Sequence, residues 1–108
     1  MRTDVHTMAE KRFPTAIQAQ FESGPLTAKG EIQNVGHSGL FLGTRTIPEQ
    51  GDLVEVEFAA PSGDRIRVSG IVWWTSPDRT PRGQLSGFGV RLLDADDPYT
   101  RFVDAIAS

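Results

Sequence analysis

The stretch Gln33-Asn34-Val35-Gly36-His37-Ser38-Gly39-Leu40-Phe41-Leu42 places a polar turn with two glycines between two apolar runs. Glycine adopts backbone angles that other residues avoid, and Asn and Ser form local hydrogen bonds with the backbone in turns. The apolar runs on either side have the composition of strands. The stretch therefore predicts two neighbouring strands joined by a tight turn, within a fold that is mainly β.

The length and composition of the chain indicate one globular domain. The chain has 108 residues, of which 38% are hydrophobic and 23% are charged, and these values are ordinary for such a domain. The absence of cysteine suits a reducing compartment, and no apolar run has the length of a signal-peptide core or a membrane helix. We therefore expect a cytoplasmic protein without membrane insertion.

The formal net charge of -3 and the pI near 5.2 bear on the class of partner. Proteins that bind nucleic acid polymers usually carry a basic stripe, so we expect no such partner. An oligonucleotide-binding barrel is an alternative class. It is disfavoured because no strand shows exposed aromatic residues alternating with Lys or Arg.

Alternation of apolar and polar residues predicts six strands. Ile17 and Phe21 share one face of the first, and Gly70 inside the fifth predicts a bulge or a close backbone approach that curls the sheet. The expected strands cover residues 16–21, 28–35, 40–44, 54–58, 65–74 and 87–93. The expected core includes Ile17, Phe21, Val56, Phe58, Val68, Val72 and Ile106.

A short helix is expected at the end of the chain. Asp97 is the predicted N-cap and Pro98 the first helical residue. Apolar residues then recur at helical spacing from Tyr99 to Ile106, which predicts that one face of the helix packs on the barrel. Residues 1–11 lack any period and are predicted to form a flexible arm, which leaves residues 12–108 as the domain.

Three segments resemble the pattern of PilZ domains, the bacterial modules that read cyclic di-GMP. They are Lys11-Arg12-Phe13-Pro14, which is similar to the family's arginine-containing opening segment, the turn from Asn34 to Gly39, and the last strand Gly87-Phe88-Gly89-Val90-Arg91. The resemblance covers about residues 10 to 107. It implies a six-stranded antiparallel β-barrel with a short C-terminal α-helix.

The resemblance also implies a nucleotide-binding element. In the family, an Arg-x-x-x-Arg element grips the phosphates and guanines of an intercalated cyclic di-GMP dimer. Aligned on the proline that follows Phe13, the two arginine positions hold Lys11 and Thr15, and a shift by one residue pairs Arg12 with Ala16. Neither Lys nor Thr replaces a guanidinium well, because the guanidinium is planar, permanently charged and able to bind phosphate through two hydrogen bonds.

The family's Asn/Asp-x-Ser-x-x-Gly turn is incomplete in the same way. Asn34 and Gly39 match it, but Gly36 stands where the motif has serine. We therefore expect weak or absent binding of cyclic di-GMP, with candidate ligand residues Lys11, Arg12, Asn34, Ser38 and Gly39. The alternative is that Asn34 and Gly39 serve only the turn, and that the two basic residues are solvated charges.

A second candidate surface lies near the fifth strand and the loop at residues 75–86, which is long for a hairpin connection. Trp73 and Trp74 are adjacent on a strand, so we expect one in the core and the other outside. Together with Arg79 and Arg82, an exposed Trp provides the residue types that dominate protein interfaces. These four residues are the predicted partner-binding group, and the alternative is that the outer Trp packs under the loop or the helix.

The sequence predicts no enzyme, metal or cofactor. His6 and His37 are far apart, and no histidine or cysteine spacing of a metal site occurs. We expect a non-enzymatic, PilZ-like adaptor that contacts another bacterial regulatory or motility protein. A competent cyclic di-GMP receptor that uses displaced basic residues is the alternative within the family.

Overall fold

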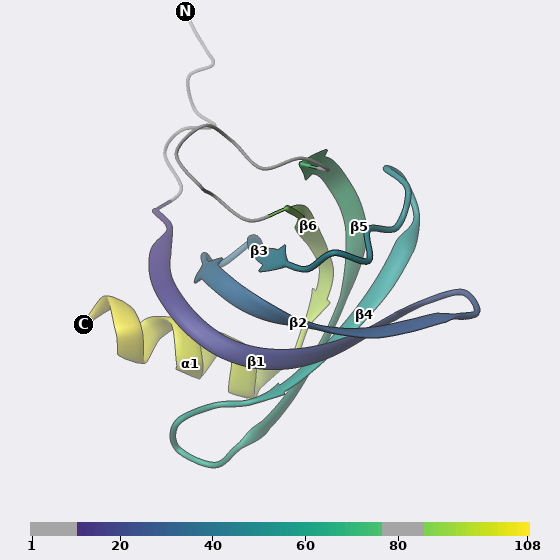
Figure 1. Cartoon of the computed structure of the whole chain (residues 1–108). Helices are drawn as coiled ribbons and strands as arrows, with labels where there is room; N and C mark the ends of the chain where they lie inside the picture. Colours follow the sequence, from purple (N-terminus) through teal and green to yellow (C-terminus); the bar gives the residue numbers. More distant parts are fainter. Residues whose placement is uncertain (1–10, 77–85) are drawn as a thin grey trace, which may run out of the picture.

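The structure, a computed structural model, describes residues 11–76 and 86–108. Six antiparallel strands form a closed barrel in the order β1-β2-β3-β6-β5-β4, and helix α1 follows the last strand (Figure 1). The barrel and its C-terminal helix agree with the sequence prediction. The elements are β1 (Phe13–Ser23), β2 (Leu26–Val35), β3 (Gly39–Gly43), β4 (Leu53–Ala59), β5 (Arg65–Ser76), β6 (Gly87–Ala95) and α1 (Asp97–Ala107).

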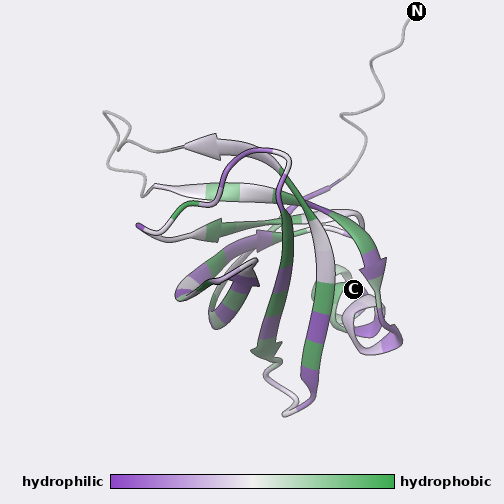
Figure 2. Cartoon of the chain, turned by 90° about the vertical axis from the view of Figure 1, so that its right-hand side faces the viewer, coloured by the Kyte–Doolittle hydropathy of each residue, from purple (hydrophilic) through white to green (hydrophobic). Residues whose placement is uncertain are grey.

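The strands carry alternating hydrophobic and hydrophilic residues, as a barrel with a dry interior and a wet outer face requires (Figure 2). Most of the predicted core residues are buried, while Ile17 and Ile106 are half-buried and pack against the core. The ring centroids of Phe21 and Phe88 lie 5.1 Å apart in an edge-to-face contact. The buried predicted residues are Phe21, Val56, Phe58, Val68 and Val72.

Turn chemistry sets the hairpins. Gly24 has a φ of 61° between β1 and β2, and Gly63 has a φ of 98° between β4 and β5. A side chain at either position would be strained, since positive φ favours glycine. Both turns lie between strands that the sequence predicts.

Helix α1 begins one residue earlier than expected. Its N-cap is Asp96, not Asp97, because the Asp96 carboxylate accepts a 2.9 Å hydrogen bond from the backbone N–H of Tyr99. An N-cap side chain bonds the amide of the second or third helical residue, and Pro98 at the second position has no N–H to offer. Among residues 11–76 and 86–108, no helix has the length and apolar character needed to cross a bilayer.

Aromatic residues anchor the helix to the barrel. Phe58 on β4 contacts Tyr99 and Phe102 of α1, with ring centroids 6.5 Å and 5.4 Å apart. Tyr99 and Val103 are fully buried and Phe102 is 8% exposed. The predicted docking of the helix face is confirmed, and α1 is part of the core.

Two bulges interrupt the ladder between β5 and β6. One lies at Gly70, as predicted, and leaves Leu93 as the extra residue on β6. A Cβ at Gly70 would collide with the carbonyl of Arg91, so the two backbones approach too closely for a side chain. The second bulge leaves Trp73 as the extra residue on β5. Bulges bend a strand and change the direction of a side chain.

Candidate functional site

The turn between β2 and β3 is closed by its own backbone. The Gly36 N–H donates a 2.8 Å hydrogen bond to the Gly39 carbonyl, and the Leu92 N–H of β6 donates to the Ser38 carbonyl at 2.9 Å. The Ser38 residue is exposed on the turn. The turn is therefore fixed to the barrel on both sides before any ligand is considered.

Arg12 lies across this turn. Its Nη1 donates a 3.0 Å hydrogen bond to the Asn34 side-chain oxygen, and a Cβ at Gly39 would lie 3.1 Å from its Nη2. The structure thus brings together three of the five candidate ligand residues, which come from the segment before β1, the end of β2 and the start of β3. Lys11 is exposed beside Arg12.

Thr15, which the resemblance aligns with the second arginine of the family element, is hydrogen-bonded within the barrel. Its hydroxyl donates a 2.7 Å hydrogen bond to the Ile32 carbonyl of β2, next to an irregularity in the pairing of β1 with β2. This hydroxyl satisfies a backbone acceptor where the ladder is interrupted. An arginine at position 15 would lose that hydrogen bond.

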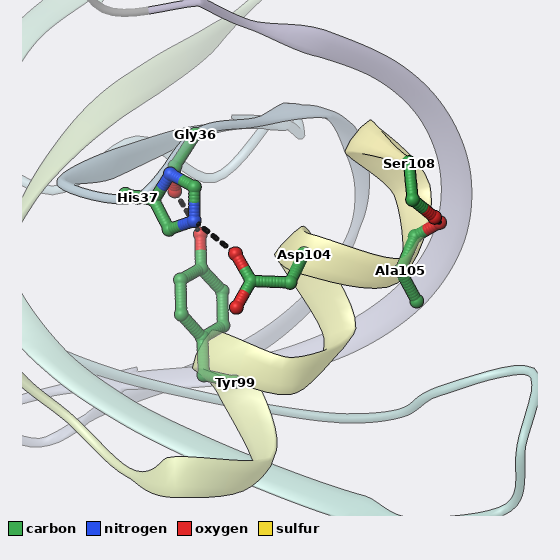
Figure 3. Close-up of polar contacts among 6 residues, drawn as sticks. All are labelled: Gly36, His37, Tyr99, Asp104, Ala105 and Ser108. Carbon is green, nitrogen blue, oxygen red and sulfur yellow. Dashed lines mark hydrogen bonds and ion pairs between the residues drawn. The ribbon is translucent and has the colours of Figure 1, made fainter.

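Helix α1 holds the turn from below, as Figure 3 shows. The buried Tyr99 hydroxyl donates a 2.7 Å hydrogen bond to the Gly36 carbonyl, and the Gly39 carbonyl lies 3.5 Å from the same oxygen. Beside it, His37 Nε2 lies 2.7 Å from Asp104 Oδ1 in an exposed contact. The signature turn and the C-terminal helix are therefore one bonded unit.

The sequence pattern places Tyr99 only on the apolar face of the helix and does not indicate the role of its hydroxyl. The available signal is its type: a tyrosine in a fully buried position needs a partner for its hydroxyl, which a phenylalanine does not. Periodicity alone does not tell which backbone carbonyl that partner is.

The predicted split of the two tryptophans, one in the core and one outside, is wrong. Trp73 is 53% exposed and Trp74 is 44% exposed, so neither is buried. The physical reason is the bulge at this point of β5, because an extra residue breaks the strict alternation of inward and outward side chains. Thr75 and Ser76, expected in the loop, continue β5. Arg79 and Arg82 lie outside the described residues.

Each tryptophan contacts a side chain on another strand. The Trp74 ring stacks on Phe41 of β3 with ring centroids 5.1 Å apart and an interplanar angle of 24°. Gly89 of β6 lies between them in the ladder, and a side chain there would collide with the Trp74 indole. The Arg91 guanidinium lies 4.8 Å from the centroid of the Trp73 ring. The two tryptophans of β5 thus contact a buried phenylalanine of β3 and an exposed arginine of β6.

Metal chemistry has no support in the part of the chain that the structure describes. No group of three His, Cys, Asp or Glu side chains there is arranged to hold an ion. The geometry offers an arginine and an amide side chain at a bonded turn, and two partly exposed tryptophans on β5.

The chain is a small closed barrel of six antiparallel strands with a polar turn between β2 and β3 and a docked C-terminal helix. The model of the PilZ domain family matches residues 7–107. The chain therefore belongs to the PilZ domain family. This result favours the family expectation over the oligonucleotide-binding barrel.

Solved structures agree on the fold. The chain is similar to the Bacillus subtilis inhibitor of motility (MotI/DgrA), with a TM-score of 0.76 and 9% identity over 99% of this chain. It covers 50% of that chain, so it spans about half the length of the motility inhibitor. The PilZ domain of CeSA from a cellulose-synthesizing bacterium gives a TM-score of 0.57 and 12% identity, with 90% and 91% of the two chains covered. No curated protein matches the sequence.

Proposed function

We propose that this chain is a non-enzymatic PilZ adaptor of the bacterial cytoplasm that acts by contact with another protein and binds cyclic di-GMP weakly or not at all. The observation that carries the proposal is that the arginine element and the turn from Asn34 to Gly39 both lack groups of the family pattern. One arginine is present at the turn and bonded to Asn34, and Thr15 is bonded into the barrel. Gly36 offers only backbone groups where the family motif has a hydroxyl.

The expected loss of affinity follows from charge and hydrogen bonding. Removing one partner of a buried charge pair costs about 2–5 kcal/mol, which corresponds to about 30- to 4000-fold in affinity. A nucleotide with two phosphates and two guanines needs several such contacts. A site with one guanidinium at the turn and an exposed lysine beside it offers fewer of them.

Calorimetric titration of cyclic di-GMP into the 108-residue chain tests the nucleotide part. We expect little or no heat at micromolar nucleotide. Arg12→Ala should remove any residual heat, because Arg12 is bonded to Asn34 at the turn. Lys29→Ala, an exposed basic residue of β2 that is not among the candidate ligand residues, is the matched control. Tight saturable binding of two nucleotides per chain would reject the weak-binding proposal.

The second candidate function, a competent cyclic di-GMP receptor, is favoured by one observation. Arg12 is bonded to Asn34 and lies beside Gly39, so the fold itself holds three candidate ligand residues together, which lowers the cost of ordering them on binding. In the same titration, tight binding that Arg12→Ala abolishes would support this function.

The protein contact is assigned to the face with Trp73 and Trp74 and to Arg79 and Arg82 of the following segment. Both tryptophans expose a large area, and Trp and Arg dominate interface energies. A regulatory or motility protein is the proposed partner, in keeping with the similarity of fold to a motility inhibitor. Trp73→Ala and the pair Arg79→Ala with Arg82→Ala should abolish capture of the native partner while the protein stays folded. Undiminished capture by these folded variants would reject this face.

A further inference from the structure

The outer face of the barrel is apolar in one region. Over residues 11–76 and 86–108, the large hydrophobic side chains that are clearly exposed are Leu53 at 67%, Leu93 at 60%, Trp73 at 53% and Trp74 at 44%. All four lie on β4, β5 and β6, which are neighbours in the barrel. Single exposed apolar residues need no explanation, but a group of them on one face marks an interaction surface.

Both bulges of the β5–β6 ladder contribute to this face. Their extra residues are Leu93 and Trp73, so each bulge leaves a large apolar side chain exposed. Leu92, just before Leu93, packs against the core, and Asp94, just after it, is exposed. The bulge therefore places two consecutive side chains, Leu93 and Asp94, on the solvent side of the strand.

Charges of opposite sign flank Leu93 along β6. Arg91 precedes it and Asp94 follows it, and both are exposed. The Arg91 guanidinium lies 4.8 Å from the centroid of the Trp73 ring, within the range of a cation–π contact. Asp94 has no ion pair within the described part of the chain.

We propose that this face binds a second copy of the same chain across a two-fold axis at Leu93. A two-fold interface must be complementary to itself, so that residue i of one copy meets residue j of the other and the reverse. The segment around Leu93 has this property, because reversal of its direction exchanges the positive and the negative position. Leu93 then packs against Leu93 of the second copy, and Arg91 of each copy faces Asp94 of the other.

The chemistry of the face fits such an interface better than a ligand pocket. Its centre is apolar and its charges lie at the sides, as in protein interfaces with a hydrophobic core and a polar rim. The inference goes beyond the proposed function, although the two share the exposed tryptophans of β5. Its test changes Leu93, Arg91 and Asp94, none of which the test of the protein partner changes, so the failure of one proposal is distinguishable from the failure of the other.

Sedimentation equilibrium of the 108-residue chain is the test. We expect a concentration-dependent dimer with twice the 11.8 kDa mass of the chain. Leu93→Glu should raise the dissociation constant by about 100-fold or more, because it places two carboxylates at the axis. Ala59→Glu, an exposed apolar position on β4 opposite Arg65, is the matched control and should leave the constant unchanged.

Charge reversal distinguishes the proposed pairing from general adhesion. Arg91→Asp and Asp94→Arg, made singly, should each weaken the dimer by at least about 30-fold, because each places like charges opposite one another. The double variant should recover the wild-type constant, and circular dichroism establishes that each variant is folded. A wild-type chain that stays monomeric up to about 500 µM, a dimer that survives Leu93→Glu, or a double variant no tighter than the single ones would overturn the proposal.

Discussion

The turn at residues 36–39 and the outer face of β5 and β6 differ in how many of their groups are bonded within the chain. The turn has its carbonyl and amide groups bonded to β6, to α1 and to itself. The outer face exposes the apolar side chains of Leu93 and Trp73 and the charged residues Arg91 and Asp94 to solvent. The turn of the family signature is thus bonded into the fold, whereas the outer face of β5 and β6 exposes more apolar surface to another molecule.

The largest expected effect comes from weakening the packing of helix α1, which is hydrogen-bonded to the turn. Phe102→Ala should lower the free energy of unfolding by about 3–5 kcal/mol, because the ring is 8% exposed and contacts both Phe58 and Tyr99. Urea denaturation measures it. An unchanged midpoint would mean that the Phe102 ring does not pack on the barrel. Helix α1 would then not be docked, and it could not hold the turn.

Tyr99→Phe isolates the hydrogen bond that joins helix and turn. The ring remains, but the buried Gly36 carbonyl loses its 2.7 Å partner, which should cost about 1–3 kcal/mol. Amide hydrogen exchange at Gly36 should also become faster, since its own bond to Gly39 is part of the same turn. Wild-type exchange in the variant would show that the turn holds without the helix.

Asp104→Ala tests the exposed contact next to that hydrogen bond. The His37 and Asp104 side chains are 55% and 62% exposed, so water screens their interaction and the expected cost is about 0.2–1 kcal/mol. Thr100→Ala, an exposed position on the same helix, is the control. A loss as large as that of Tyr99→Phe would place the main link at the surface and not in the core.

The smallest effect is expected on the outer face. Leu53→Ala should change the stability of the monomer by less than about 0.5 kcal/mol, because the side chain is 67% exposed. Its neighbour Val54 is 2% exposed, and Val54→Ala should cost about 2 kcal/mol. Thermal unfolding of the two variants at low protein concentration compares the stability loss at the exposed Leu53 with that at the buried Val54. Equal losses would mean that Leu53 already packs against the chain, and the outer face would not be available.

The sequence predicts the fold well, since alternation and turn residues act locally. The pattern from Ile17 to Phe21 and the glycine at position 63 suffice to predict strands and a hairpin. The exposure of both tryptophans is not predictable in this way, because it depends on the register between β5 and β6. A single extra residue changes which way a side chain points, and only the pairing of two distant segments decides where that residue lies.

In the candidate site, too, the sequence reveals the local motif but not the contacts between distant segments. The match of Asn34 and Gly39 to the family turn is visible in the sequence, but the contact of Arg12 with both residues depends on how the opening segment enters β1. The hydrogen bond from Thr15 to Ile32 depends on an irregular pairing that no local pattern specifies.

The bond between Tyr99 and Gly36 has an evolutionary consequence. A descendant of this domain that lost all use for a nucleotide would still need the turn, because the turn gives the buried tyrosine hydroxyl its acceptor. Selection for folding would then preserve Gly39, where a side chain would collide with the Val90 carbonyl, whereas Arg12 and the asparagine it bonds would be free to drift. Within such lineages, the turn reports ancestry and the opening arginines report current ligand use.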